Sequence, residues 1–321
     1  MKNSTETNTL TEIGLDLIKG FSAKPKNISS KYFYDDEGSK IFQEIMKMPE
    51  YYLTNAEQEI FETQSGAIVT KLQNLKDHLV IEMGAGDGSK TFYLLRELLN
   101  QKNNTKYIPV DISRKALENL TSSINSKLPD LLIEPIHGDY FSIQTQLDFC
   151  HGESLFLYLG SNIGNYENQN LKDLLDLFYG LMKKGDKILI GFDLQKNPYK
   201  ILDAYNDKAG LTKKFNLNLL HRLNRELGGN IDVGKFDFYP FYNPYLGELR
   251  SCLISLEKQE IYFDLLEKSF VLEKNELIFT ELSKKYSIEG IESLAHSHNF
   301  KIIDHFTDSK GFFIDSLWQK V

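Results

Sequence analysis

Residues 79–91 read Leu-Val-Ile-Glu-Met-Gly-Ala-Gly-Asp-Gly-Ser-Lys-Thr, and the rest of the chain is organised around this stretch. Its first five residues are typical of a buried strand, and a helix is expected to begin near Ser89. Three glycines in five residues leave a loop without side chains, so backbone amides and the positive end of the next helix can approach a ligand closely. A strand, a glycine loop and a helix in this order predict a nucleotide-binding turn.

The spacing of Gly84, Gly86 and Gly88 narrows the kind of nucleotide. The dinucleotide fingerprint GxGxxG needs its third glycine one place later, where this chain has Ser89. Glu82 precedes the loop, and Asp111 follows a second apolar run, where its carboxylate can hold ribose hydroxyls. This pairing resembles the S-adenosylmethionine (SAM) site of Rossmann-like methyltransferases. For an isolated GxGxG, a turn that only closes a βα unit is the alternative.

A third strand-like run, residues 131–136, is followed by Asp139 and Tyr140, a carboxylate and an aromatic ring that can meet an adenine. Open α/β sheets bind ligands at the carboxyl ends of their strands. The three strand ends therefore predict one cofactor site.

Strands and helices alternate regularly around the glycine loop, which predicts an α/β fold. Right-handed βαβ connections give a doubly wound, mostly parallel sheet. Two terminal runs, residues 300–306 and 312–318, are expected to close it as a hairpin. The other expected strands span residues 79–83, 107–110, 131–136, 154–159 and 187–192, and the expected helices span residues 55–72, 90–99 and 114–128.

The alternation breaks after Asp193, and the segment that follows is expected to be an insertion. We predict a SAM-binding domain of residues 62–195 plus 285–321. Residues 1–61 plus 196–284 would form a second, substrate-binding domain that packs over the strand ends as a lid.

Composition limits the partners of the protein. The chain has 321 residues, of which 41% are hydrophobic, so it can bury a sizeable core. A net charge of -8 and a pI near 5.5 argue against a nucleic-acid partner, because phosphate binding needs clustered Lys and Arg. The N-terminus is polar, and no stretch is long and apolar enough to cross a bilayer. We expect a monomeric cytoplasmic protein that binds a small molecule.

Neither a disulfide framework nor a metal site is expected. Cys150 and Cys252 lack CxxC spacing. His296 and His298 have no third ligand nearby at zinc spacing and are interpreted as surface residues.

Several separate motifs, in a common order over nearly the whole chain, resemble the histidine Nα-methyltransferases of the ergothioneine pathway. The motifs are Tyr32-Phe33-Tyr34-Asp35, Pro49-Glu50-Tyr51-Tyr52, Glu82-Met83-Gly84-Ala85-Gly86, Val110-Asp111-Ile112-Ser113, Gly160-Ser161-Asn162-Ile163-Gly164-Asn165, Asn224-Arg225-Glu226-Leu227 and Thr280-Glu281-Leu282-Ser283. The resemblance implies a Rossmann-like class I methyltransferase fold with SAM as cofactor, S-adenosylhomocysteine as its product, and a second domain for the amino acid.

The resemblance also implies roles for individual residues on the substrate side. Asn165 would hold the α-amino group, Tyr205 and Ser283 the carboxylate, and Tyr51 with Glu281 the imidazole. Tyr34 would close over the amine, and it is the candidate for accepting a proton, directly or through a water. Packing within a core is the alternative for Tyr34 and Tyr51.

On the cofactor side, Lys90 would meet the methionine carboxylate of SAM, Asp111 the ribose, and Asp139 with Tyr140 the adenine. The glycines and Glu82 complete the cofactor set together with Gly160. A solvated surface lysine is the alternative for Lys90.

The expected reaction is methylation of the α-amino group of L-histidine, up to the trimethylated betaine hercynine. One position departs from the family: Ser251 stands where a methionine usually packs against the substrate side chain. Two alternatives therefore stay open. The acceptor is another amino acid such as tryptophan or tyrosine, or the chain binds SAM without catalysis.

Overall fold

The computed structural model describes residues 4–72, 77–101, 104–140 and 154–321 of the chain. Cys150 lies outside the described residues. The chain divides into two compact units. The larger unit comprises Leu53–Gln195 and Lys284–Val321, and the smaller unit comprises Met1–Tyr52 and Lys196–Ser283. The first boundary falls at Tyr52 rather than after residue 61, because residues 52–71 form one continuous helix.

The larger unit contains a mostly parallel sheet, which in the described residues has eight strands in the order β13-β14-β7-β6-β2-β3-β4, with β5 also paired to β3. The prediction of a doubly wound sheet closed by a terminal hairpin is confirmed. Among the described strands of this sheet, β14 runs opposite to the others, because it pairs antiparallel with both β13 and β7, whereas the remaining pairs are parallel. The strands are β2 (Asp77–Met83), β3 (Asn104–Asp111), β4 (Leu132–Ile133), β5 (Ile136–His137), β6 (Ser154–Tyr158), β7 (Lys187–Asp193), β13 (Phe300–Thr307) and β14 (Phe313–Lys320).

Strand β2 lies between β3 and β6, so the strand order reverses direction beside it. Ligands bind at such a switch point, in the crevice outside the carboxyl ends of the strands. The glycine loop follows β2 at this edge, and the segment 160–165 follows β6. The fold therefore brings two sequence motifs, 70 or more residues apart, to the two sides of one switch point.

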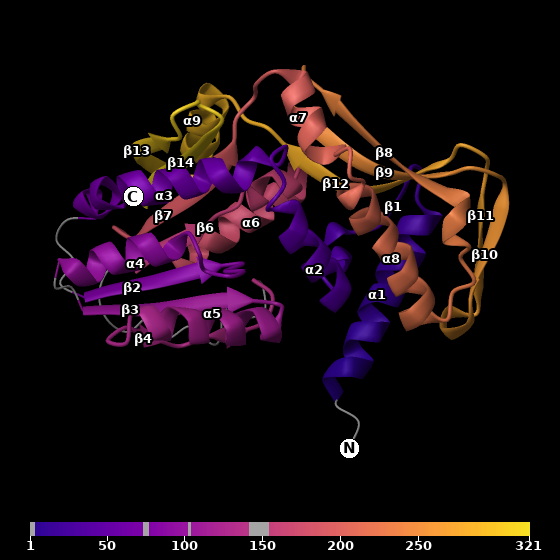
Figure 1. Ribbon diagram of the computed structural model, residues 1–321, viewed down its shortest axis with the longest axis horizontal. Coiled ribbons are helices and arrows are strands. Elements are labelled where there is room, and N and C mark those ends of the chain that lie inside the picture. The colour runs from indigo at the N-terminus through magenta and orange to yellow at the C-terminus, as the bar shows by residue number, and fades with distance from the viewer. Residues whose placement is uncertain (1–3, 73–76, 102–103, 141–153) are drawn as a thin grey trace. The chain divides into compact units, whose positions relative to one another are not determined.

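Apolar side chains of the sheet meet helices of the larger unit. On one face Ile81, Phe156 and Ile188 pack with Phe178 and Ile291, so two helices that follow β6 and precede β13 cover this face. Figure 1 shows α4 and α5 flanking the strands β2 and β3. The helices are α3 (Tyr52–Lys71), α4 (Thr91–Asn100), α5 (Arg114–Lys127), the 3-10 helix η3 (Asn162–Asn165), α6 (Asn168–Leu181) and α9 (Ile288–Ser297).

The smaller unit combines the N-terminal segment of the chain with the segment inserted after β7. A sheet in the order β1-β12-β9-β8 joins β1 (Lys26–Asn27) to β12 (Leu277–Lys284), β9 (Glu248–Ser255) and β8 (Phe236–Asn243). A separate hairpin pairs β10 (Gln259–Phe263) with β11 (Lys268–Leu272). The helices are α1 (Ser4–Ser22), η1 (Ser30–Phe33), α2 (Asp36–Ile45), α7 (Pro198–Tyr205), α8 (Leu211–Leu227), η4 (Val233–Lys235) and η5 (Asp264–Leu266).

The core of the smaller unit joins residues from the beginning and from the later part of the chain. Phe33 and Ile41 are buried against Leu219 and Leu223 of α8 and against Ile278 of β12. The first fifty residues and the segment 196–283 therefore share one core.

Two sequence expectations need correction. The run 131–136 forms two short strands rather than one, because Pro135 has no N–H to continue the pairing with β3. Helices α6 and α9 and strands β8, β11 and β12 were not among the expected elements.

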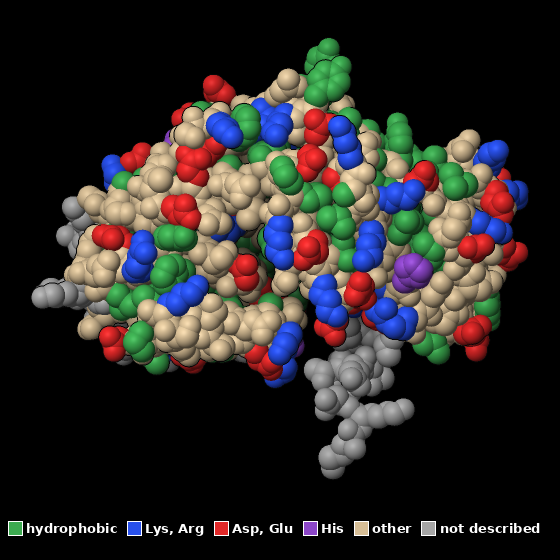
Figure 2. Space-filling view, in the orientation of Figure 1, with side chains coloured by type: hydrophobic (Ala, Val, Ile, Leu, Met, Phe, Trp, Pro, Cys, Tyr) green, Lys and Arg blue, Asp and Glu red, His purple; other side chains and the backbone are tan. Residues whose placement is uncertain are grey.

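The surface has mixed charge: acidic and basic side chains are interspersed over the face shown in Figure 2. Among the described helices, none combines the length and the apolar character needed to cross a membrane.

Candidate functional site

All three glycines of the loop after β2 have positive φ angles, 76° at Gly84, 56° at Gly86 and 66° at Gly88, which favour glycine. The amides of Gly84 and Ala85 both donate to the carbonyl of Val110, at 2.8 and 3.1 Å. A Cβ atom on Gly86 would have no neighbour within 4 Å. The backbone at Gly86 is therefore open to a ligand.

Asp111, at the end of β3, is joined to this loop. One carboxylate oxygen accepts the N–H of Gly86 at 3.0 Å, and the other accepts the N–H of Ser113 at 2.8 Å. The side chain is half-buried. Each carboxylate oxygen has a second lone pair, so Asp111 can accept ribose hydroxyls while it holds the loop.

Tyr140 also lies at this edge. A Cβ atom on Gly84 would stand 2.5 Å from the Tyr140 hydroxyl, and the Tyr140 ring packs edge-on against Tyr158 with centroids 5.7 Å apart. Asp139 is exposed beside it. The structure thus brings together Gly84, Gly86, Asp111 and Tyr140.

Gly88 supports the loop through packing. A Cβ atom on Gly88 would lie 2.9 Å from the side chain of Leu120, so the glycine permits close packing against α5. A contact between Gly88 and the cofactor stays a prediction.

Glu82 is buried near the end of β2, and its contact with the cofactor stays a prediction. Its carboxylate is 3% exposed and accepts hydrogen bonds from Thr91, at 2.7 Å, and from the hydroxyl of Tyr107. Burial raises the pKa of Glu82 to about 7, although both hydrogen bonds act in the opposite direction. Through these two hydrogen bonds Glu82 connects β2 with β3 and α4, the elements next to the glycine loop.

Lys90 immediately precedes α4, and its ammonium is paired with the carboxylate of Glu57 from α3. The other oxygen of Glu57 accepts the N–H of Gly160 at 2.7 Å. Burial lowers the pKa of Lys90, but the charge of Glu57 outweighs it and the pKa is raised. The ammonium of Lys90 is therefore mostly buried and paired with Glu57, rather than solvated.

Glu57 was not singled out in the sequence. The sequence does contain a pattern that indicates a buried Glu57. Glu57 occupies the helical face that also carries Leu53, Ile60 and Phe61, at spacings of three and four residues. A carboxylate on an otherwise apolar face indicates a buried partner.

Asn165 ends the segment that follows β6. Gly160 and Ser161 take left-handed φ angles of 73° and 57°, which turn the chain into η3. The hydroxyl of Ser161 accepts the N–H of Asp193 at 3.0 Å. Asn165 is half-buried and stands near the carboxyl end of β6, beside the switch point.

In the smaller unit, four aromatic side chains form a continuous row, Tyr34, Phe42, Tyr51 and Tyr205. Their successive ring centroids lie 5.5, 6.1 and 6.1 Å apart, each in an edge-on arrangement. Phe42 packs between Tyr34 and Tyr51, the two tyrosines for which packing and substrate binding are both open. The rings of this row pack against one another, and three of the four carry a phenol hydroxyl.

Polar groups meet the end of this aromatic row. Tyr205 and Ser283 share a hydrogen bond of 2.8 Å between their hydroxyls, and the hydroxyl of Ser251 donates to Glu281 at 3.4 Å. Glu281 and Ser283 are two residues apart on β12 and so project from the same face. Ser251 and Ser283 are buried, whereas Glu281 is half-buried.

Thr280 fixes this face from the opposite side of β12. Its hydroxyl lies 2.9 Å from the side-chain oxygen of Asn216 and 2.9 Å from the carbonyl of Ser251. Asn216 is fully buried on α8. The strand that carries Glu281 and Ser283 is therefore held to its neighbour β9 and to α8.

Asp35 holds the segment next to Tyr34. It caps α2 by accepting the N–H of Gly38 at 2.7 Å, and it also binds Asn218 at 2.9 Å and Arg225 at 2.5 Å. Burial raises the pKa of Asp35, but these hydrogen bonds together bring it below its usual value. An ionised carboxylate thus joins the segment to α8.

The structure brings the predicted residues together in two groups. One, in the larger unit, contains Gly84, Gly86, Asp111, Asp139, Tyr140, Lys90, Gly160 and Asn165; the other, in the smaller unit, contains Tyr34, Tyr51, Tyr205, Ser251, Glu281 and Ser283. Within the described ranges, no cluster of three or more His, Cys, Asp or Glu side chains could hold a metal ion. Both groups carry hydrogen-bond donors and acceptors, and their roles toward a cofactor and an amino acid stay predictions.

Comparison with known proteins identifies a family model and relatives that match most of the chain. The sequence model of the family described as histidine-specific methyltransferase, SAM-dependent, matches residues 13–320. A histidine N-alpha-methyltransferase of Mycobacterium tuberculosis is 32% identical over 228 residues, which cover 71% of this chain and 70% of that protein. The enzyme of the same name from Mycolicibacterium smegmatis is 33% identical over 228 residues, with the same coverage, 71% and 70%.

A more distant relative is named for a different acceptor. The 4-dimethylallyltryptophan N-methyltransferase of Claviceps purpurea is 26% identical over 199 residues, which cover 59% of this chain and 57% of that protein.

Proposed function

The chain belongs to the family of histidine-specific, SAM-dependent methyltransferases, and from this premise we propose that it methylates the α-amino group of L-histidine, up to the trimethylated betaine. The observation that carries the proposal is the polar end of the aromatic row. Hydroxyls of Tyr205 and Ser283 can donate to a substrate carboxylate, and Glu281 can accept an imidazole N–H. In this proposal the enzyme is a cytoplasmic monomer.

The aromatic row suits the product as well as the substrate. Successive methylation moves the nitrogen toward a permanent cation, and the faces of tyrosine rings attract such cations. Tyr34 and Tyr51 are held at fixed angles through Phe42, so their orientation does not have to be established at each turnover.

Cofactor binding rests on the larger unit. The open backbone at Gly86 and the carboxylate of Asp111 would hold the ribose, while Tyr140 and Asp139 would line the adenine. Lys90 would donate to the methionine carboxylate. When bound, SAM supplies an electrophilic methyl group on a sulfonium sulfur.

The remaining chemistry is that of the amine. An α-amino group is mostly protonated at neutral pH, so it must release a proton before its lone pair can form the new N–C bond. We propose that Asn165 accepts an N–H of the amine and so orients the lone pair. Tyr34, directly or through a water, would take part in removing the proton. Orientation of the two reactants supplies much of the rate.

The direct experiment incubates the protein with SAM and L-histidine and follows the amino acid by mass spectrometry. We expect species heavier by one, two and three methyl groups, with S-adenosylhomocysteine formed in equal number. Histidine that stays unmodified while SAM is bound would contradict the proposed acceptor.

A second acceptor class is favoured by one observation. Ser251 is buried and small where it contacts Glu281, which leaves more room for a side chain than a methionine would. An aromatic amino acid such as tryptophan or tyrosine is the competing substrate. Parallel incubations with the three amino acids separate the two possibilities, since the preferred acceptor has the highest kcat/KM.

Reciprocal substitutions test the division of labour between the two groups. We expect Glu281→Ala to raise the KM for histidine at least tenfold, on the order of 1.4 kcal/mol, and to leave the Kd for S-adenosylhomocysteine within about twofold. Asp111→Ala should weaken S-adenosylhomocysteine about tenfold, as expected for a lost charged hydrogen bond. Isothermal titration and initial rates measure both, and equal effects of the two variants on cofactor affinity would contradict separate roles.

A further inference from the structure

Glu57 is a buried carboxylate that the reaction scheme leaves without a role. It is 1% exposed, on the face of α3 that packs into the larger unit. Burying an ionised carboxylate costs several kcal/mol unless a partner compensates for it. Its surroundings are therefore expected to supply hydrogen-bond donors or a cation that compensate for the buried charge.

The site of Glu57 is built from four separate elements. One oxygen contacts the ammonium of Lys90 at the start of α4, and the other accepts the N–H of Gly160 after β6 at 2.7 Å. In β7, a Cβ atom on Gly191 would lie 2.5 Å from a Glu57 oxygen, so only a glycine leaves room for the carboxylate there. Asp315 of β14 is the register partner of Gly191.

Three carboxyl groups act on the charge of Lys90, namely Glu57, Asp315 and Glu82. Burial raises the pKa of Asp315 well above its usual value, and the charge of Glu57 raises it further against the opposite effect of Lys90, which favours the neutral form of Asp315. Burial also raises the pKa of Glu82, to about 7. Glu57 is the carboxylate that contacts the ammonium directly.

Lys90 lies on the solvent side of the pair. Its side chain is 20% exposed, against 1% for Glu57. An ammonium carries three donors, so it can serve Glu57 and a ligand carboxylate at the same time. A lysine side chain is otherwise flexible, and its ordering on binding costs affinity.

We propose that Glu57 is a positioning residue for the methionine end of SAM, because it fixes the direction of the Lys90 ammonium and of the Gly160 amide before the cofactor binds. The inference rests on the proposed function, in which Lys90 meets the methionine carboxylate. It assigns Glu57 no contact with the cofactor itself.

Two ligands test the proposal, S-adenosylhomocysteine and 5′-methylthioadenosine, which lacks the amino-acid end. Glu57→Gln keeps the size of the side chain and an oxygen for the Gly160 amide, but it removes the charge opposite Lys90. We expect this variant to bind S-adenosylhomocysteine about tenfold more weakly by isothermal titration and to bind 5′-methylthioadenosine within twofold of the unaltered protein.

The pH dependence provides a readout that a packing role would not change. Without the charge of Glu57, burial lowers the pKa of Lys90, and the ammonium loses its proton as the pH rises. The ratio of variant to unaltered affinity for S-adenosylhomocysteine should therefore fall as the pH is raised. Glu57→Asp keeps the charge and should recover part of the affinity.

Glu62→Gln is the matched control, because Glu62 lies on the exposed side of the same helix. It should leave both affinities unchanged. Should Glu57→Gln not fold, Glu57→Asp alone decides, since it must weaken S-adenosylhomocysteine more than 5′-methylthioadenosine.

Equal weakening of the two ligands by the Glu57 variants, or no weakening, overturns the inference. A loss of S-adenosylhomocysteine affinity in Lys90→Met but not in Glu57→Gln overturns it while the proposed function stands. If the unaltered protein binds no S-adenosylhomocysteine, the proposed function itself is wrong.

Discussion

Glu82 is a carboxyl group in a place that water does not reach, and its protonation links stability to pH. Its pKa in the folded protein is about 7, above the usual value of 4.5, mainly because of burial. The folded state therefore binds this proton more tightly than the unfolded state. The free energy of unfolding falls as the pH rises from about 4.5 to about 7, and this contribution stays constant above.

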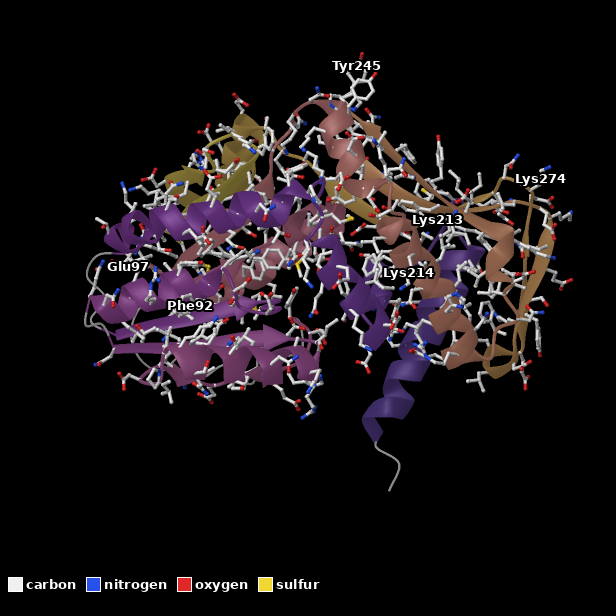
Figure 3. All side chains as sticks on the ribbon, in the orientation of Figure 1. Phe92, Glu97, Lys213, Lys214, Tyr245 and Lys274 are labelled. Carbon is white, nitrogen blue, oxygen red and sulfur yellow. The ribbon has the colours of Figure 1, made fainter. Side chains whose placement is uncertain are left out.

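We expect Glu82→Gln to remove this part of the pH dependence. The contribution is on the order of 3 kcal/mol, from a pKa difference of about 2.5 at about 1.4 kcal/mol per unit. Urea unfolding at pH 5, 6, 7 and 8 measures it, and the variant should gain stability relative to the unaltered protein across this range. Glu97→Gln, at the other end of α4 (Figure 3), is the control and should run parallel to the unaltered protein.

Residues of the cofactor group differ in how far they could be predicted. Asp111, Gly86 and Tyr140 follow parallel strands, and the carboxyl ends of such strands meet at one edge, so their proximity follows from the order of the elements. Glu57 stands 33 residues before Lys90 and 103 before Gly160. Its contacts depend on how α3 packs on the sheet, which spacing along the chain does not express.

At the scale of the element, two glycines of one loop have different purposes. Gly86 and Gly88 share the left-handed backbone, but only Gly88 is packed against α5. An alanine at either place costs about 1–2 kcal/mol for the backbone. At Gly88 the new methyl group would also meet Leu120 at 2.9 Å and Ile124 at 3.1 Å, which adds about 1–3 kcal/mol.

We therefore expect Gly88→Ala to destabilise the protein more than Gly86→Ala, measured by chemical denaturation. The order should reverse for S-adenosylhomocysteine affinity, because the open side of Gly86 is where a ligand would approach. Equal losses of stability in the two variants would show that α5 yields to the methyl group.

The strands of the larger unit could be predicted because each is a continuous apolar run between polar turns, as in β6 and β7, which are buried throughout. The same rule gave a wrong prediction for the run 131–136. Its apolar residues suggest one strand, but Pro135 interrupts the pairing with β3. The sheet of the smaller unit could not be predicted in full, because β8 mixes aromatic residues with a proline and is mostly half-buried, which matches no simple alternation.

At the scale of the whole molecule, the chain passes between the units three times, and the last two of these crossings are tied together within the larger unit. Asp193 ends β7 just before the second crossing, and Lys285 follows the third. Their side chains form an ion pair of 2.8 Å with both partners fully buried. The backbones are joined too, by Tyr286 N–H to the Asp193 carbonyl at 2.9 Å and Gln195 N–H to the Tyr286 carbonyl at 2.8 Å.

We expect Lys285→Met to destabilise the protein by about 3–5 kcal/mol, because it leaves a buried charge without its partner. The double variant Asp193→Leu/Lys285→Met should cost less than the single one. Lys258→Met, which breaks the exposed pair with Glu273, should cost less than about 1 kcal/mol. Thermal and urea unfolding measure all three, and a double variant that is less stable than Lys285→Met would contradict a coupled pair.

The parallel pairing of β1 with β12 has a consequence for biosynthesis. Lys26 is in register with Ile278, and α2 packs on α8, which begins at Leu211. At a translation rate of about 5–20 residues per second, roughly 10 to 30 seconds separate the emergence of α2 from that of α8. During this time the apolar residues of α2 lack their partner in α8, so the nascent N-terminal segment is expected to expose apolar surface until α8 is made.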